Sequence, residues 1–160
     1  MNIILTGETA SGKTTACLKL AALLKGHNIT TGGIICENDR IKDLAGASRK
    51  FYFPAGTAGT VSVGRYHIKQ SALAFGSRAI ERACKGARVI FIDEFGRLEY
   101  NKEGFYRAVT RALATGRSLV VVRKSILAPF QLLFPQYRFT TFTLTPANRN
   151  SIHEEIFARV

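Results

Sequence analysis

The sequence predicts an α/β fold with three layers: a mostly parallel sheet of five strands or slightly more, with helices on both faces. Strand-like segments alternate along the chain with segments of helical periodicity, which is the order that a parallel sheet requires. Several strand segments are apolar at every position, as expected where both faces of a sheet are covered. With 160 residues, of which 46% are hydrophobic, we expect one domain spanning residues 1–160.

The individual elements follow from local patterns. The predicted strands are short apolar or β-prone runs at residues 1–6, 29–36, 88–92, 118–122 and 137–144. The predicted helices cover residues 16–25, 67–85, 103–115, 126–133 and the end of the chain from Pro146. Between the second strand and the second helix, short β-prone pieces and turn residues predict a small β excursion at about residues 37–66.

The loop after the first strand matches G-x-x-x-x-G-K-[ST], the phosphate-binding P-loop. It reads Gly7-Glu8-Thr9-Ala10-Ser11-Gly12-Lys13-Thr14-Thr15. Its glycines allow backbone angles that turn the N–H groups toward a chain of phosphates. Lys13 would reach the β- and γ-phosphates, and the Thr14 hydroxyl would bind Mg²⁺. The sequence therefore predicts a P-loop NTPase fold in which residues 7–15 bind a nucleotide, and the helix that begins at about Gly12 adds the positive end of its dipole.

A second part of the site is expected where the strand at residues 88–92 ends. Asp93 and Glu94 follow it directly, in a Walker B pattern, and ligands bind at this edge of an open α/β sheet. Asp93 is predicted to hold Mg²⁺ through its water shell. Glu94 is placed to orient and polarise an attacking water, which favours hydrolysis over transfer to a bound acceptor. The predicted catalytic residues are therefore Lys13 and Glu94, with Thr14 and Asp93 at the metal.

The sequence leaves open which arginine completes the site. Positive charge near the γ-phosphate stabilises the transition state. The candidates are Arg49, Arg65, Arg97 and Arg123, together with Arg149, which is expected either to stack on the base or to belong to a helix start. Arg97 and Arg123 should lie nearest the ligand edge of the sheet, because each follows a predicted strand closely.

Charge and composition limit the function classes. The chain has 23 basic and 11 acidic residues, a net charge of +12, and the excess is spread over both halves. This suits a polyanionic ligand, with RNA or DNA as an open alternative to a solvated basic surface. The three cysteines form no C-x-x-C pair, which disfavours zinc. No apolar run approaches the roughly 20 residues of a membrane span, and we expect a cytoplasmic protein without a signal peptide or membrane contact.

The chain resembles a family of small nucleoside-triphosphatases known from hyperthermophilic bacteria and archaea, with a cancer-related vertebrate member. The resemblance rests on Thr6 to Thr15, on V-G-x-Y at Val63, Gly64 and Tyr66, on Ile92-Asp93-Glu94-Phe95-Gly96-Arg97-Leu98-Glu99, and on Leu144-Thr145-Pro146-Ala147-Asn148-Arg149. It implies Mg²⁺-dependent hydrolysis of ATP, GTP and other nucleoside triphosphates with loose base selectivity. It also implies nucleotide contacts at residues 7–14 and 89–96. The chain departs from the family's basic G-x-R-x-G-F element, which here reads Gly46-Ala47-Ser48-Arg49-Lys50-Phe51-Tyr52.

Two other functions fit the same motifs. A small nucleoside or nucleotide kinase would use residues 37–66 to bind an acceptor, although no arginine-rich lid insertion is visible between the late strand and helix. A nucleotide-switched RNA- or DNA-binding protein would use the charge of +12. Hydrolysis of nucleoside triphosphates is the function that we expect, because an acidic residue directly follows the Walker B aspartate.

Overall fold

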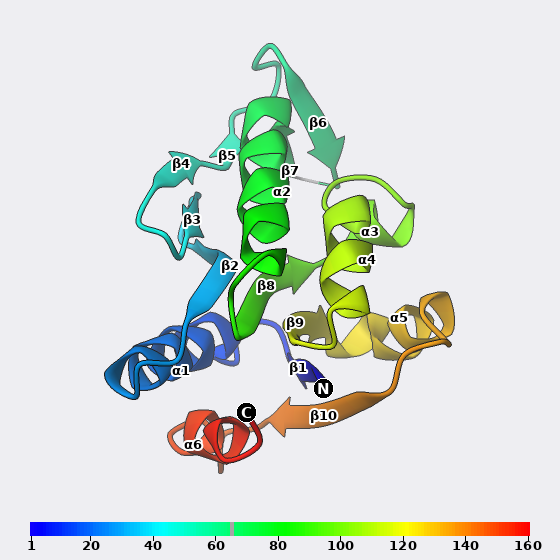
Figure 1. Cartoon of the computed structure of the whole chain (residues 1–160). Helices are drawn as coiled ribbons and strands as arrows, with labels where there is room; N and C mark the ends of the chain where they lie inside the picture. The colour runs from blue at the N-terminus through cyan, green and yellow to red at the C-terminus, as the bar shows by residue number, and fades with distance from the viewer. Residues whose placement is uncertain (65) are drawn as a thin grey trace.

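The computed structural model describes residues 1–64 and 66–160, which form three layers with a central, mostly parallel sheet (Figure 1). The parallel strands are β1 (Asn2–Gly7), β2 (Thr31–Glu37), β8 (Val89–Phe95), β9 (Ser118–Arg123) and β10 (Phe139–Leu144). They lie side by side in the order β10-β1-β9-β8-β2. The short strands β3 (Arg40–Asp43) and β4 (Ser48–Lys50) extend the sheet beyond β2 in antiparallel pairing. This sheet confirms the predicted fold class.

Helices cover both faces of the sheet. On one face α1 (Lys13–Gly26) packs beside α6 (Ile152–Phe157), and on the other α2 (Gln70–Cys84) packs beside α4 (Tyr106–Ala114), as Figure 1 shows. The shorter elements are α3 (Arg97–Tyr100), the 3₁₀ helix η1 (Lys124–Ile126) and α5 (Leu127–Leu133). No helix in the described part of the chain is long and apolar enough to cross a membrane.

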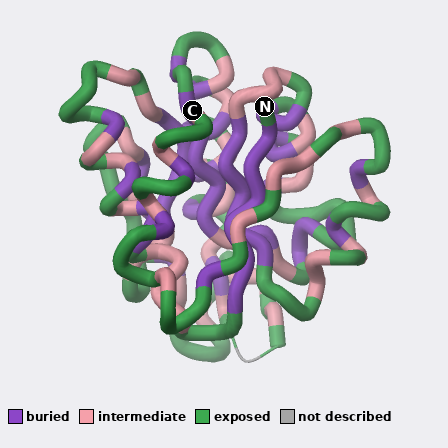
Figure 2. The backbone as a smooth tube through the Cα atoms, turned by 90° about the horizontal axis from the view of Figure 1, so that it is seen from below, coloured by how far each residue is buried: buried purple, intermediate pink, exposed green. Residues whose placement is uncertain are grey.

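The central strands are apolar at consecutive positions because each of their faces contributes to a separate core. In β1, Ile4 belongs to the core that α2 and α4 cover, whereas Leu5 belongs to the core that α1 and α6 cover. In β8, Ile92 and Phe91 divide between the two cores in the same way. Figure 2 shows the resulting concentration of buried residues along the middle strands. Side chains that alternate between two covered faces therefore explain the continuous apolar runs.

A second sheet of three antiparallel strands stands at the top of Figure 1. It consists of β5 (Tyr52–Phe53), β6 (Thr60–Val63) and β7 (Tyr66–Lys69), with β7 in the middle. The predicted helix start at residue 67 is therefore wrong. Residues 67–69 pair with β6 and belong to β7, so the β excursion reaches residue 69 and α2 begins only at Gln70.

The prediction that Pro146 begins the last helix is also wrong. Residues 146–151 form turns, and α6 begins at Ile152. Asn148 fixes the first of these turns, because its Oδ1 accepts a hydrogen bond from the Thr145 N–H at 2.8 Å and its Nδ2 donates to the Thr143 carbonyl oxygen at 3.0 Å. An asparagine side chain that bonds nearby backbone groups favours a turn over a helix.

Gly33 in β2 lies opposite Phe91 in β8, with the Phe91 backbone close to its Cα. Its φ is +94°, and a Cβ added there would lie 2.1 Å from the carbonyl oxygen of Phe91. Because both the backbone conformation and the contact exclude a side chain, we predict that Gly33→Ala lowers the free energy of unfolding by about 3 kcal/mol or more. Urea denaturation measures this change.

The matched control for this substitution is Gly86→Ala. A Cβ on Gly86 would meet none of the described atoms within 4 Å. The control should change the free energy of unfolding by less than about 0.5 kcal/mol. Equal losses from the two substitutions would contradict the close packing of β2 against β8.

Candidate active site

The predicted phosphate loop, residues 7–15, joins β1 to α1 at the carboxyl end of the parallel strands. Gly12 has a φ of +100°, the left-handed conformation that the loop needs at the helix start. The side chain of Lys13 folds back over the loop. Its Nζ donates to the carbonyl oxygens of Gly7 at 3.1 Å and Glu8 at 2.5 Å. The loop thus holds the ammonium group beside the N-terminus of α1.

Both positive and negative side chains surround Lys13. Burial lowers the pKa of its ammonium group, and the neighbouring Arg123 lowers this pKa further. The carboxylates of Asp93, Glu8 and Glu94 act in the opposite direction. The structure therefore brings the predicted catalytic lysine into the electrostatic neighbourhood of both predicted acidic residues.

Asp93 is buried, with 3% of its surface exposed. Its Oδ2 accepts a hydrogen bond from the Cys36 N–H in β2 at 3.1 Å, and its carboxyl group also forms a hydrogen bond with the Thr14 side chain. Burial raises the pKa of Asp93 to about 7, although the hydrogen bonds from Thr14 and Cys36 oppose this rise. The two residues predicted to hold Mg²⁺ are therefore in contact.

The chemistry of this pair fits Mg²⁺. The metal prefers oxygen ligands, and it is usually bound by one or two protein groups together with water and substrate phosphates. Thr14 offers a hydroxyl and Asp93 a carboxylate, and no lysine or arginine among the described residues forms an ion pair with Asp93. A divalent cation at this point would supply the positive charge that a buried, ionised carboxylate requires.

The strand that carries the two carboxylates contains a β-bulge. We predicted that it ends at Ile92, but β8 continues to Phe95. Between Ile92 and Phe95 it advances three residues, while β9 advances two, from Val120 to Val122. Glu94 lies in this bulge with a φ of +91°, an unusual conformation for a residue with a side chain. A bulge redirects a side chain that would otherwise follow the regular alternation of the strand.

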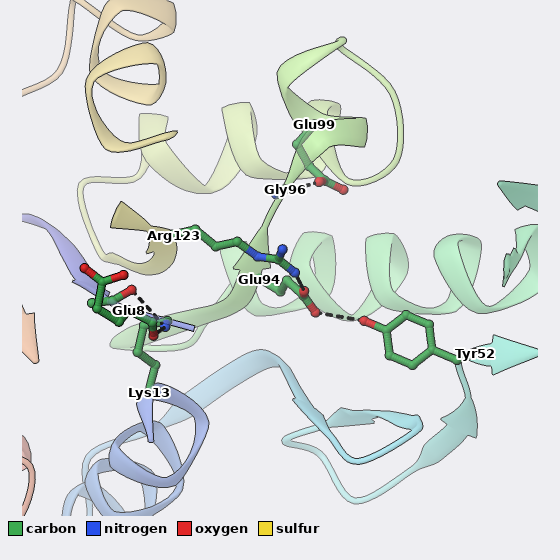
Figure 3. Close-up of polar contacts among 8 residues, drawn as sticks. Glu8, Lys13, Tyr52, Glu94, Gly96, Glu99 and Arg123 are labelled. Carbon is green, nitrogen blue, oxygen red and sulfur yellow. Dashed lines mark hydrogen bonds and ion pairs between the residues drawn. The ribbon is translucent and has the colours of Figure 1, made fainter. Parts of the chain in front are cut away.

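The Glu94 side chain is fixed from two directions (Figure 3). Its Oε1 accepts a hydrogen bond from Arg123 Nη2 at 2.6 Å, and its Oε2 accepts one from the Tyr52 hydroxyl at 3.0 Å. Arg123 is the last residue of β9, and Tyr52 lies in β5 of the small sheet. Burial raises the pKa of Tyr52, and Glu94 raises it further, so its hydroxyl keeps the proton that it donates. In Figure 3, Lys13 and Tyr52 lie on opposite sides of Glu94.

The structure shows which of the candidate arginines lie near Glu94. Arg123 contacts Glu94 directly, and Arg97 at the start of α3 lines a cavity next to it. The remaining candidates are Arg49, which lies 5.4 Å from the centre of the Phe75 ring, Arg149, which is exposed in the turn after β10, and Arg65, which lies outside the described residues. Sequence reasoning missed Tyr52, because nothing in a short β excursion indicates that one tyrosine reaches a carboxylate 42 residues further along the chain.

Comparisons with known proteins identify relatives of this chain. A family model described as NTPase matches residues 2–157. A nucleoside-triphosphatase THEP1 from Methanopyrus kandleri is 32% identical, and the alignment covers 99% of this chain and 94% of that protein. A nucleoside-triphosphatase THEP1 from Thermofilum pendens is 28% identical, with 97% and 92% covered. The crystal structure of THEP1 from the hyperthermophile Aquifex aeolicus superposes with a TM-score of 0.78 at 25% identity and covers 99% of this chain and 98% of that one.

The raised pKa of Asp93 predicts a pH-dependent stability. Below about pH 4 the carboxyl group is protonated in both the folded and unfolded states and imposes no cost. As the pH rises toward 7, the unfolded chain ionises more readily than the folded one, and the fold loses stability. Without metal or nucleotide, Asp93→Asn should therefore raise the free energy of unfolding at pH 8 by up to about 4 kcal/mol.

Urea denaturation at pH 4, 6 and 8 tests this prediction. The difference between Asp93→Asn and the wild type should be small at pH 4 and should grow with pH. Glu103→Gln, at an exposed position, is the control and should change the free energy of unfolding by less than about 0.5 kcal/mol throughout. A wild type more stable than Asp93→Asn at pH 8 would show that burial does not dominate the environment of Asp93.

Proposed function

The chain belongs to the NTPase family, and from this premise we propose that it hydrolyses ATP, GTP and other nucleoside triphosphates to the diphosphate and phosphate. The reaction would depend on Mg²⁺ and tolerate different bases. The observation that carries this proposal is the Glu94 carboxylate, which Arg123 and Tyr52 hold beside the phosphate loop. A fixed carboxylate at this position suits the activation of a water molecule.

The phosphate loop would bind the triphosphate through the backbone N–H groups of residues 7–15 and the positive end of α1. The ammonium group of Lys13 would exchange the carbonyl oxygens of Gly7 and Glu8 for oxygens of the β- and γ-phosphates. Thr14 and Asp93 would hold Mg²⁺, which supplies charge neutralisation on the β- and γ-phosphates. Stacking of the base on the exposed Arg149 would accept any base, since every base has a π-face.

Glu94 would act as the general base. It takes a proton from water as the oxygen attacks the γ-phosphorus, the bond to the bridging oxygen breaks, and the diphosphate leaves. Arg123 fixes one carboxylate oxygen of Glu94 and also lies close enough to Lys13 to lower its pKa. The same guanidinium is therefore placed to stabilise the charge on the transferring phosphoryl group. Tyr52 fixes the other oxygen and sets the orientation of the carboxylate.

Substitution of the two proposed catalytic residues tests the reaction. In assays of phosphate release with Mg²⁺ from ATP, GTP, CTP and UTP, Glu94→Gln should lower kcat by about 10²- to 10⁴-fold and retain nucleotide binding. Lys13→Ala should lower both activity and binding, and the exposed Glu103→Gln should change neither. If Glu94→Gln turned over at the wild-type rate, Glu94 would not be the base. The same assays with added RNA test the nucleic-acid partner that the charge of +12 suggests.

Tyr52→Phe tests the positioning of Glu94. Loss of the hydroxyl removes one hydrogen bond to the carboxylate, so kcat should fall about tenfold with KM nearly unchanged. In the Glu94→Gln background the same substitution should have no further effect, because both changes act on one group. Tyr100→Phe, on an exposed tyrosine, is the control. Additive losses in the double variant would show that Tyr52 acts independently of Glu94.

A further inference from the structure

A cavity of about 590 Å³ lies next to Glu94, between the small sheet, α2 and α3. Its volume is within the usual range for small-molecule sites. The walls are mainly aromatic and aliphatic, with the rings of Phe51, Tyr52, Tyr66 and Phe105 and the side chains of Ile68 and Leu98. The Phe51 and Phe105 rings are stacked at a centroid distance of 6.2 Å, and the Tyr52 and Tyr66 rings lie 5.0 Å apart.

The cavity wall also carries polar side chains, including Arg97 and Ser125. Glu94, Arg123 and Thr9 line the cavity, and Thr9 belongs to the loop. The other buried carboxylate in the wall, Glu99, already accepts hydrogen bonds from the Gly96 N–H at 2.9 Å and the Phe105 N–H at 3.0 Å. Glu99 is also only 4% exposed and shapes the wall, whereas the Glu94 side chain is 31% exposed and is the carboxylate that a ligand hydroxyl can reach.

The position of the cavity fits an incoming nucleophile better than the nucleoside of the bound triphosphate. In phosphoryl transfer the attacking and leaving oxygens lie roughly in line with the phosphorus. A γ-phosphate bound between Lys13 and Glu94 would leave the β- and α-phosphates and the nucleoside to extend away from Glu94 along the loop. Tyr52 lines the cavity and contacts Glu94 on the side away from Lys13 (Figure 3), and the cavity also reaches Thr9 of the loop. With the triphosphate bound in this way, the cavity would open toward the face of the γ-phosphorus at which a nucleophile attacks.

We propose that this cavity binds a second substrate, an aromatic or heteroaromatic alcohol, which accepts the γ-phosphoryl group in place of water; this rests on the proposed function of Glu94. The flat ring lies among the aromatic side chains, and the hydroxyl points to Glu94. The hydroxyl oxygen forms a bond to the γ-phosphorus, the bond between that phosphorus and the bridging oxygen breaks, and Glu94 takes the hydroxyl proton. The products are a phosphomonoester and the nucleoside diphosphate.

The aromatic walls of the cavity favour a ligand with a flat ring, and transfer of the phosphoryl group requires that this ligand carry a hydroxyl. Stacked and edge-on aromatic contacts favour a flat partner over an aliphatic one of the same size. An apolar interior also excludes water from the attacking position when a ligand fills it, which suppresses hydrolysis in favour of transfer. Water would use the same carboxylate when the cavity holds no alcohol, so hydrolysis and transfer share one base.

The test uses the full chain with benzyl alcohol, 3-pyridinemethanol and 2-naphthalenemethanol as probes and cyclohexanemethanol as the non-aromatic comparison. With Mg²⁺ and a non-hydrolysable ATP analogue present, ligand-observed NMR should show the aromatic probes binding, the largest with a dissociation constant of about 1 mM or below. With Mg²⁺ and ATP, ³¹P NMR should show a new phosphomonoester resonance.

Two variants fill the cavity from different walls, Val63→Phe from β6 and Leu73→Phe from α2. Each should weaken probe binding at least tenfold and abolish the phosphomonoester, while the KM for ATP changes less than twofold. Leu132→Phe is the matched control, because Leu132 is 80% exposed on α5 and does not line the cavity. Two variants are used so that a folding defect in one does not remove the test, and circular dichroism checks both.

The possible outcomes separate this inference from the proposed hydrolysis. A wild type that hydrolyses ATP but binds no aromatic probe, or binds probes and forms no phosphomonoester, overturns the second substrate and leaves hydrolysis intact. A tenfold rise in the KM for ATP in both cavity variants overturns it too, because the nucleoside itself would then occupy the cavity. A chain that forms phosphomonoester but releases no phosphate in the absence of alcohol supports the second substrate and contradicts hydrolysis.

Discussion

The structure depends on keeping two carboxylates at the end of a strand that is covered on both faces. Asp93 is buried and its pKa is raised by that burial, so the fold places a group there that is costly to ionise. The contacts that limit this cost come from β2, through the Cys36 N–H, and from the helix that follows the phosphate loop, through Thr14. The sheet order therefore determines the site, because it sets β8 between β2 and β9.

The same constraint explains the bulge in β8. Two successive residues of a regular strand point to opposite faces of the sheet. The bulge and the positive φ of Glu94 break that alternation and direct its carboxylate to Arg123 and Tyr52. Backbone strain of this kind costs about 1–3 kcal/mol and persists where the surroundings hold it in place. Here the strain accompanies a carboxylate whose two oxygens are both hydrogen-bonded, an arrangement suited to a positioned base.

The parts of the fold that depend on local pattern were predictable. Apolar runs indicated the five parallel strands, and the P-loop motif with Asp93 and Glu94 indicated the edge of the sheet where the site lies. The small sheet was only partly predictable, because β7 is defined by pairing with β6 and β5, which lie in separate short segments. The contact between Tyr52 and Glu94 joins that sheet to the central one, and no local pattern reports such a long-range contact.

The most direct test of Glu94 as the base is a crystal structure of Glu94→Gln with ATP and Mg²⁺. The predicted result is a γ-phosphate at Lys13, with an ordered water or the mouth of the cavity in line with the bond from the γ-phosphorus to the bridging oxygen. The side chain at position 94 should lie within hydrogen-bond distance of the point from which the nucleophile attacks. A γ-phosphate that lies against another part of the sheet edge, with residue 94 turned away from the line of attack, would contradict the assignment of Glu94.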